Sequence, residues 1–198
     1  MSAIRKPKKK LTEDEYLVIE AAAEFKSEFY NGEMFAMAGA NLAHNTIKEN
    51  LIVELGARLK GGPCRSYSSD MRVKVKRSGL YTYPDIVIVC GAPEVEKRQG
   101  LETLLNPQVV IEVLSKTTES YDRGTKFQLL KKLPAVKEYI LVSSDRVNVD
   151  RLVRQTDGKW LLTTFDKLTG KMVLETVPVR IPLADVYRGV ELPESPGL

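Results

Sequence analysis

The sequence predicts an α/β fold: a mixed (α+β) sheet with helices on its faces. Three observations predict this class. Residues 84–90 and 108–115 are apolar on both strand faces, which is typical of interior strands. A four-residue apolar spacing indicates an amphipathic helix, at Ile47, Leu51, Leu55 and Leu59. A strand, a helix and a strand follow one another between residues 108 and 144, which indicates a right-handed βαβ unit.

Length and composition favour one ordinary globular domain. The chain has 198 residues, of which 43% are hydrophobic and 28% charged, enough for one core. We expect a single domain at 11–190, a basic tail at 1–10 and a loose end at 191–198. The two cysteines, Cys64 and Cys90, form no CxxC pair and are not expected to build a disulfide framework, which suits a reducing cytoplasm. No apolar stretch predicts a membrane span or a signal peptide.

The positive charge of the chain is concentrated at its N-terminus. The net charge is +4, and residues 1–10 contribute +5, so the remainder carries 4 − 5 = −1. The tail is either a solvated end or an arm that contacts phosphates. Charge therefore permits a nucleic-acid partner without requiring one.

Local signals place the remaining elements along the chain. Thr12 with Glu15 predicts a capped helix, and Asn31-Gly32 predicts a hairpin turn. The long helix should begin after Asn41 and end at Gly61-Gly62-Pro63. Residues 71–76 alternate apolar and basic side chains, which predicts a half-exposed strand.

The last third of the sequence predicts antiparallel strands. A helix over 121–133 should stop at Pro134, and the strand at 138–144 should follow. Residues 147–153 and 159–165 form two strands with a turn at Asp157-Gly158, and residues 171–179 are expected to continue the same sheet.

Two carboxylates interrupt the apolar strands. Asp85 should share a strand face with Val87 and Val89, and Glu112 should share one with Val110 and Leu114. A buried carboxylate must be protonated, paired with a base or bound to a cation. Two acids on adjacent strands repel each other unless a cation lies between them, and oxygen ligands favour Mg²⁺ or Mn²⁺. Alternatively, Asp85 is a solvated turn residue.

Three further polar residues are candidates for the same site. Lys126 should lie near the start of the helix that follows Glu112, where its ammonium could stabilise charge on a phosphate. It could instead be exposed or paired with Asp122. His44, the only histidine, stands at a helix start and is either a structural donor or a site residue. Asp70 is either a turn residue or an outer carboxylate, and Ser115, Thr117 and Thr118 could cap the loop or bind phosphate.

These residues carry a family resemblance. The segments YPDIVIV, IEVLSKTTESYDRGTK and EYILV, together with FKSEFYNGE and AHNTI, resemble the Uma-type restriction endonuclease family. That family is numerous in cyanobacteria and belongs to the PD-(D/E)XK nuclease superfamily. The resemblance runs from about Leu11 to Val190 and implies a restriction-endonuclease-like core with a C-terminal antiparallel extension.

The resemblance also implies roles for individual residues. Asp85 and Glu112 match the motif acids, and the backbone carbonyl of Val113 would be a further metal ligand. The superfamily's lysine position is occupied here by Leu114, and Lys126 matches the migrated lysine of the family. Glu28 matches an acid from an early element, and His44 could face the site beside it.

The leading hypothesis is a Mg²⁺- or Mn²⁺-dependent endonuclease that hydrolyses phosphodiester bonds of nucleic acid, with DNA expected. By analogy with nucleases of this fold it would be a homodimer. Cysteine usage and the lack of an apolar span lead us to expect a cytoplasmic protein without a membrane partner. One alternative is a catalytically degenerate module of the same fold that binds nucleic acid or regulates. Another is a structural protein with a satisfied buried acid pair.

Overall fold

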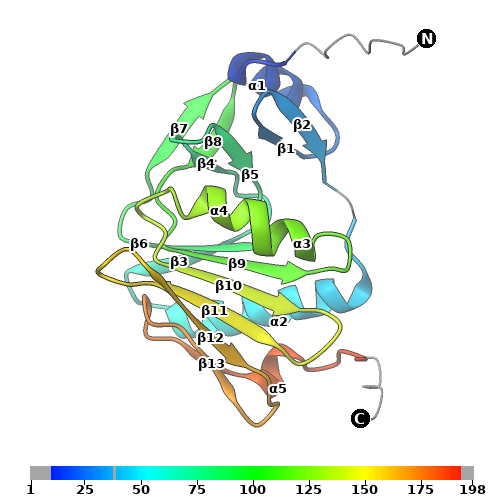
Figure 1. Cartoon of the computed structure of the whole chain (residues 1–198), viewed down its shortest axis with the longest axis vertical. Coiled ribbons are helices and arrows are strands. Elements are labelled where there is room, and N and C mark those ends of the chain that lie inside the picture. The colour runs from blue at the N-terminus through cyan, green and yellow to red at the C-terminus, as the bar shows by residue number, and fades with distance from the viewer. Residues whose placement is uncertain (1–9, 38, 193–198) are drawn as a thin grey trace, which may run out of the picture.

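The computed structural model describes residues 10–37 and 39–192. Most of the predicted basic tail and residues 193–198 of the predicted loose end lie outside these ranges. None of the helices within the ranges is both long and apolar enough to cross a membrane. Figure 1 shows a central sheet with helices on both sides and a second sheet toward the N-terminal end.

The central sheet has six strands in the order β12-β11-β10-β9-β6-β3. Strands β9 and β10 are parallel, and the other neighbours are antiparallel, so the predicted mixed sheet and its antiparallel extension are confirmed. The strand bounds are β3 Cys64–Ser68, β6 Ile86–Cys90, β9 Val109–Leu114, β10 Glu138–Ser143, β11 Val149–Arg154 and β12 Trp160–Phe165.

Both faces of the central sheet are covered. On one face, the long helix α2 (Leu42–Leu59) packs its predicted stripe of Ile47, Leu51, Leu55 and Leu59 against Ile86, Ile88 and Ile111. Asn41 caps this helix through the His44 N–H, as predicted. On the other face, α4 (Phe127–Leu130) packs over Val87, Val110 and Tyr139. The apolar character of β6 and β9 on both faces therefore reflects two separate cores.

The second sheet was not foreseen as a separate layer. Its order is β2-β1-β5-β4-β8-β7, and its strands are β1 Ser27–Tyr30, β2 Glu33–Ala36, β4 Val73–Val75, β5 Leu80–Thr82, β7 Val95–Arg98 and β8 Leu101–Leu104. The predicted turn at Asn31-Gly32 joins β1 to β2, and both of its residues have positive φ (53° and 82°). Helix α1 (Glu13–Ala22) begins with the predicted Thr12–Glu15 capping box and packs on this sheet.

The prediction of a half-exposed strand at 71–76 was wrong. Arg72 and Lys74 are buried rather than solvated. The Lys74 ammonium pairs with Glu13 at 3.0 Å and with Glu96 at 3.1 Å. The Arg72 guanidinium binds Thr103 and lies 5.5 Å from the Tyr81 ring centre. Acids and aromatic rings from distant segments compensate these charges, and alternation along one strand cannot reveal such partners.

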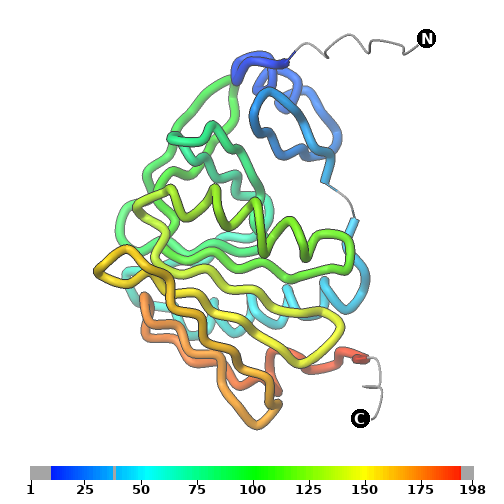
Figure 2. Tube along the Cα trace, viewed as in Figure 1, coloured from blue at the N-terminus to red at the C-terminus, as the bar shows by residue number. Residues whose placement is uncertain are grey.

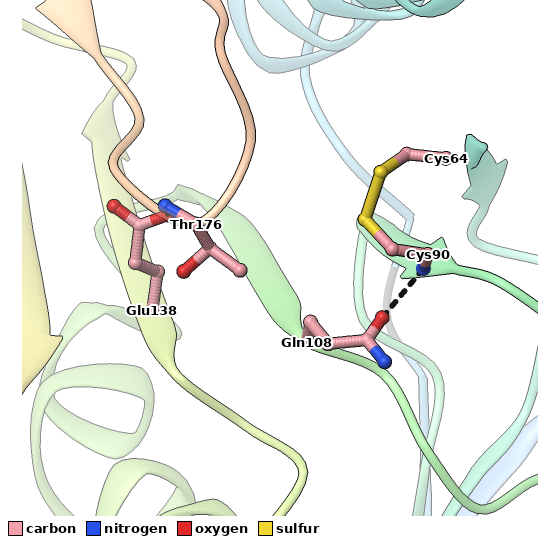
Figure 3. Close-up of a disulfide and its surroundings, with 5 residues drawn as sticks. All are labelled: Cys64, Cys90, Gln108, Glu138 and Thr176. Atoms are coloured by element: carbon pink, nitrogen blue, oxygen red, sulfur yellow. Dashed lines mark hydrogen bonds between the residues drawn. A yellow bond between two sulfur atoms is a disulfide. The ribbon is translucent and has the colours of Figure 1, made fainter. Parts of the chain in front are cut away.

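One expectation about the C-terminal third also requires correction. Residues 171–179 do not continue the central sheet: β13 (Lys171–Val173) pairs with β14 (Arg180–Pro182) as a separate ribbon, followed by α5 (Leu183–Val186). Buried Glu138 holds the loop between them, because its carboxylate accepts hydrogen bonds from the Glu175 and Thr176 N–H groups at 2.7 and 2.8 Å. Figure 3 shows Glu138 beside Thr176.

The cysteines differ from the expectation as well. Cys64 and Cys90 form a disulfide between β3 and β6 (Figure 3). The two residues are direct partners in the β3–β6 register, which brings their side chains together although 26 positions separate them in the sequence. Sequence spacing gave no sign of this pairing, because strand register alone creates it.

Candidate active site

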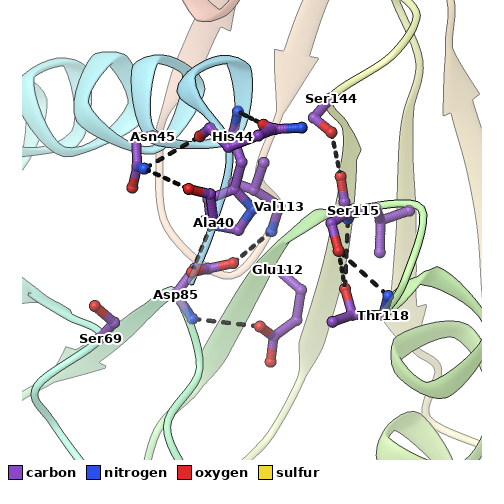
Figure 4. Close-up of polar contacts among 12 residues, drawn as sticks. Ala40, His44, Asn45, Ser69, Asp85, Glu112, Val113, Ser115, Thr118 and Ser144 are labelled. Atoms are coloured by element: carbon purple, nitrogen blue, oxygen red, sulfur yellow. Dashed lines mark hydrogen bonds and ion pairs between the residues drawn. The ribbon is translucent and has the colours of Figure 1, made fainter. Parts of the chain in front are cut away.

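The two strand acids meet where β6 and β9 separate. The last paired positions are Ile86 and Ile111, so Asp85 and Glu112 lie one residue beyond the ladder. The Asp85 N–H donates to Glu112 Oε2 at 3.3 Å, and the Val113 N–H donates to Asp85 Oδ2 at 2.9 Å (Figure 4). The predicted adjacency of these acids is therefore present in the fold.

Alternation predicts the strand face correctly for Glu112 but not for Asp85. Asp85 precedes β6, and its carboxylate reaches His44 on α2, the helix that covers the opposite face. Val87 and Val89 on β6 and Val110 and Leu114 on β9 all belong to one core cluster, on the face that α4 covers. Glu112 is 3% exposed, so its carboxylate interrupts this apolar face as expected. The alternative in which Asp85 is a solvated turn residue does not hold, because its side chain is only 14% exposed.

Lys126 reaches the acids from the helix after β9. This helix consists of α3 (Glu119–Tyr121), a π-helical turn η1 (Asp122–Lys126) and α4. The Lys126 ammonium lies 2.8 Å from Glu112 Oε1, 3.0 Å from Glu28 Oε1 and 3.6 Å from Asp122 Oδ1. Lys126 is 4% exposed, so the alternative of an exposed helix lysine does not hold, although the pairing with Asp122 does. A π-helical turn is often found at functional sites.

Glu28 enters the cluster from the hairpin. It lies on β1, and its carboxylate accepts hydrogen bonds from Thr82 and from the Tyr121 hydroxyl, the latter at 2.9 Å. Neither hydroxyl residue was singled out from the sequence. Tyr121 lies within the segment that carried the family resemblance, but Thr82 gave no local signal because its role depends on the β1–β5 pairing.

His44 also faces the acids. Its Nε2 lies 3.1 Å from Asp85 Oδ1, and the ring is buried in the first turn of α2 (Figure 4). Its Nδ1 is buried and has no hydrogen-bond partner within the described ranges. Asp70 is different: its side chain is 84% exposed and pairs with Lys26, so the structure does not bring it into this cluster.

Electrostatics within the cluster are strongly coupled. Burial by itself would lower the pKa of Lys126, but Glu112, Glu28 and Asp122 outweigh it and raise that pKa well above its usual value. Burial raises the pKa of Glu112, with Asp122 and Asp85 acting in the same direction against Lys126. Burial would also raise the pKa of Glu28, yet Lys126 and the two hydroxyl donors lower it. The site thus favours positive charge beside Glu112.

The donor set fits a hard divalent cation. Asp85 and Glu112 supply carboxylate oxygens. The Val113 carbonyl points toward the start of β6, as the Val113 N–H does, because the N–H and C=O of one strand residue point to the same side of the strand. Within the described ranges, no three Asp, Glu, His or Cys side chains could hold a metal by themselves. Mg²⁺ commonly uses only one or two carboxylates and keeps several waters or phosphate oxygens, so this set is sufficient for it.

A cavity of about 450 Å³ opens onto the cluster. Part of its lining is apolar and comes from Phe35, Ala36, Met37, Gly39 and Ala40. Ser115, Thr117 and Thr118 contribute hydroxyls to the lining. These hydroxyls bond to one another at 3.0 Å and close the loop after β9, as the capping alternative predicted. Lys48 on α2 and Asn45 also line the cavity.

A mixed sheet that brings two strand acids, a helix lysine and an early glutamate to one cavity defines a restriction-endonuclease-like protein. A solved structure supports the fold: a "putative nuclease belonging to DUF820" from Anabaena variabilis superposes with a TM-score of 0.71, over 88% of this chain and 96% of that chain, at 17% identity.

The family follows from sequence comparison. The model of the Uma2 family, described as "Putative restriction endonuclease", matches residues 13–184, and the chain belongs to this family. Two Synechocystis sp. PCC 6803 proteins are similar to it. The "Uncharacterized protein slr1290" is 32% identical over 93% of this chain and 95% of the relative. The "Uncharacterized protein sll1609" is 33% identical over 77% of this chain and 86% of the relative.

Proposed function

We propose that this protein hydrolyses phosphodiester bonds of nucleic acid, with DNA as the substrate, in a reaction that requires Mg²⁺ or Mn²⁺. One observation carries the proposal: Asp85 and Glu112 meet at the end of two interior strands, with Lys126 2.8 Å from Glu112. The family to which the chain belongs supports a nuclease, since its description names a restriction endonuclease.

The cation would be held by Asp85, Glu112 and the Val113 carbonyl. It would supply Lewis acidity toward a phosphoryl oxygen and an attacking water. Lys126 holds its ammonium at the base of the cavity, where it can donate to an oxygen that gains negative charge. Glu28 and Asp122 hold that ammonium in place from two other elements.

His44 orients Asp85 in this proposal. The Nε2 contact fixes one oxygen of the carboxylate, and the Val113 N–H fixes the other. With both contacts in place, the carboxylate cannot rotate freely and presents its remaining lone pairs to the cavity. We therefore assign His44 a positioning role rather than a direct part in bond cleavage.

A degenerate module of the same fold is the second candidate. The observation that favours it is Leu114 in the position of the superfamily's lysine, together with a Lys126 ammonium already engaged by three carboxylates. Such a module would bind nucleic acid without cutting it. The two candidates differ in cleavage and in cation binding.

Two isosteric variants test the proposal. Asp85→Asn and Glu112→Gln keep the shape of each side chain but remove its charge, so cleavage of plasmid DNA with Mn²⁺ should fall at least a hundredfold. Calorimetric titration with Mn²⁺ should show binding to the parent protein and strongly weakened binding to both variants. Asp70→Asn, outside the cluster, is the matched control and should cut as the parent does.

Two outcomes would reject this function. Undiminished cleavage by Asp85→Asn or Glu112→Gln would remove these acids from the chemistry. A parent protein that binds DNA but neither binds Mn²⁺ nor cuts would favour the degenerate module instead.

A further inference from the structure

The β1–β2 hairpin presents one face to the active-site cavity. In its register Glu28 pairs with Phe35, and cross-strand partners lie on the same face. The next pair, Phe29 with Met34, points the other way, where Phe29 stacks on Tyr16 in the core. Phe35 is therefore a direct neighbour of the glutamate that holds Lys126.

Phe35 has an unusual environment for a large aromatic residue. It is 48% exposed, whereas Phe29, the aromatic residue on the opposite hairpin face, is 3% exposed. Met37, two residues later, is 37% exposed, and both side chains line the cavity together with Ala36, Gly39 and Ala40. This apolar wall lies directly beside the acid cluster.

Other parts of the cavity lining carry polar groups that can contact a phosphate. Ser115, Thr117 and Thr118 contribute hydroxyls, and Lys48 contributes an ammonium from α2. Figure 2 shows the first turn of α2 near the loop after β9, and residues of both line the cavity. The cavity lining thus combines apolar side chains, Phe35 and Met37, with hydroxyl and ammonium groups, and these suit the base and the phosphate of a nucleotide.

We propose that the cavity receives one unpaired nucleotide, with its base against Phe35 and Met37 and its phosphate beside Asp85, Glu112 and Lys48. This inference rests on the proposed function and adds a substrate class: a single-stranded or unpaired DNA segment. A base within a duplex is stacked on both sides and cannot offer its face to a side chain, whereas an unpaired base can.

The charge of the chain supports stacking as a main source of affinity. Apart from residues 1–10 the chain carries a net charge of 4 − 5 = −1, so attraction of the folded part to phosphates is weak. The buried carboxylates also oppose a phosphate until a cation is bound. Contact between a base and Phe35 supplies affinity that depends neither on the net charge of the chain nor on the charge of the buried carboxylates.

Binding to a single strand and to a duplex separates this inference from its alternatives. The full chain is used in an Asp85→Asn background, and fluorescence anisotropy is measured with a labelled 12-nucleotide single strand and with the blunt duplex of the same sequence. We expect the single strand to bind at least tenfold more tightly. Phe35→Ala should weaken single-strand binding about tenfold and leave duplex binding unchanged.

Two controls complete the design. Phe25→Ala removes an aromatic ring that is 77% exposed but does not line the cavity, and it should change neither affinity. Phe35→Trp should retain the single-strand affinity because it keeps a stacking surface. A 2-aminopurine placed within the strand should change its fluorescence on binding to the parent background and not on binding to the Phe35→Ala variant.

Equal affinity for duplex and single strand, or the same result for Phe35→Ala and Phe25→Ala, would overturn the inference. These measurements do not depend on cleavage. If Asp85→Asn still cuts DNA, the proposed function falls; if Asp85→Asn is inactive and Phe35→Ala binds normally, only the unpaired-base subsite falls.

Discussion

At Lys126 one buried ammonium contacts three buried carboxyl groups. The contacts to Glu112, Glu28 and Asp122 span 2.8–3.6 Å, and all four side chains are at most 9% exposed. Breaking a buried ion pair is costly because it leaves an uncompensated charge. The stability of the active-site region therefore depends on Lys126, in addition to the role proposed for Lys126 in the reaction.

We expect Lys126→Met to lower the free energy of unfolding by about 3–5 kcal/mol at pH 7, since three acids lose their base without loss of packing volume. Urea denaturation in the presence of a chelator measures this change in the free energy of unfolding. Lys132→Met, on the exposed side of the same segment, should stay within about 0.5 kcal/mol of the parent. Equal stability of the two variants would show that Lys126 does not compensate the cluster.

At this scale the sequence predicted the acids better than their surroundings. Asp85 and Glu112 were found because they break an apolar alternation, and alternation is local. Lys126 was a candidate because it should lie near the start of the helix after Glu112, and Glu28 was placed through family resemblance alone. Thr82 and Tyr121 were missed, since their hydrogen bonds to Glu28 join segments that are 54 and 93 positions away from it.

At the scale of elements, ion pairs and hydrogen bonds connect the helix that carries Lys126 to β11 and β12 of the antiparallel extension. Arg123 in the π-helical turn pairs with Asp150 on β11 at 2.6 Å, and Thr164 on β12 donates to the same carboxylate at 2.6 Å. Arg123 also binds Glu119 at 2.7 Å. These contacts hold the turn that carries Lys126 against the sheet.

The variant Asp150→Asn tests these contacts through the pH dependence of protein stability. Burial opposes ionisation, but Thr164 and Arg123 lower the pKa of Asp150 below its usual 3.8. A depressed folded-state pKa stabilises the protein above the unfolded-state pKa, and this contribution disappears as the pH falls below it. The variant should be about 1–3 kcal/mol less stable than the parent at pH 7.

The difference between parent and variant should shrink as the pH falls below the usual pKa of 3.8 and Asp150 is protonated in the parent. Urea denaturation at stepped pH values measures both proteins. Asp166→Asn changes an exposed acid and serves as the control. A difference that stays constant or grows on acidification would contradict the assigned role of Asp150.

At the scale of the whole molecule, the Cys64–Cys90 disulfide joins two strands of the central sheet. Closing a loop of 26 positions should stabilise the fold by roughly 3 kcal/mol in the chain-entropy account. Oxidised protein should contain no free thiol, because both cysteines of the chain are paired.

Reduction, or the double variant Cys64→Ala/Cys90→Ala, should lower the melting temperature by roughly 6–12 °C. Calorimetry with and without dithiothreitol measures this, and dithiothreitol should not affect the double variant. An unchanged melting temperature would show that the bond contributes nothing. The reducing cytoplasm and the homodimer both stay predictions. A reducing compartment would favour the reduced form of the protein, which is the less stable form.

The sequence by itself determined the elements whose signals are local: the stripe of α2, its Asn41 cap, the Asn31-Gly32 turn and the two-sided apolar strands with their acids. Only the tertiary structure decided the second sheet, the separate β13–β14 ribbon, the disulfide, the burial of Lys74 and the convergence of Glu28 on Lys126. The physical reason is the sequence separation over which each interaction acts. Periodicity and capping act within a few residues, whereas pairing of strands and compensation of buried charge join segments whose sequence separation carries no signal.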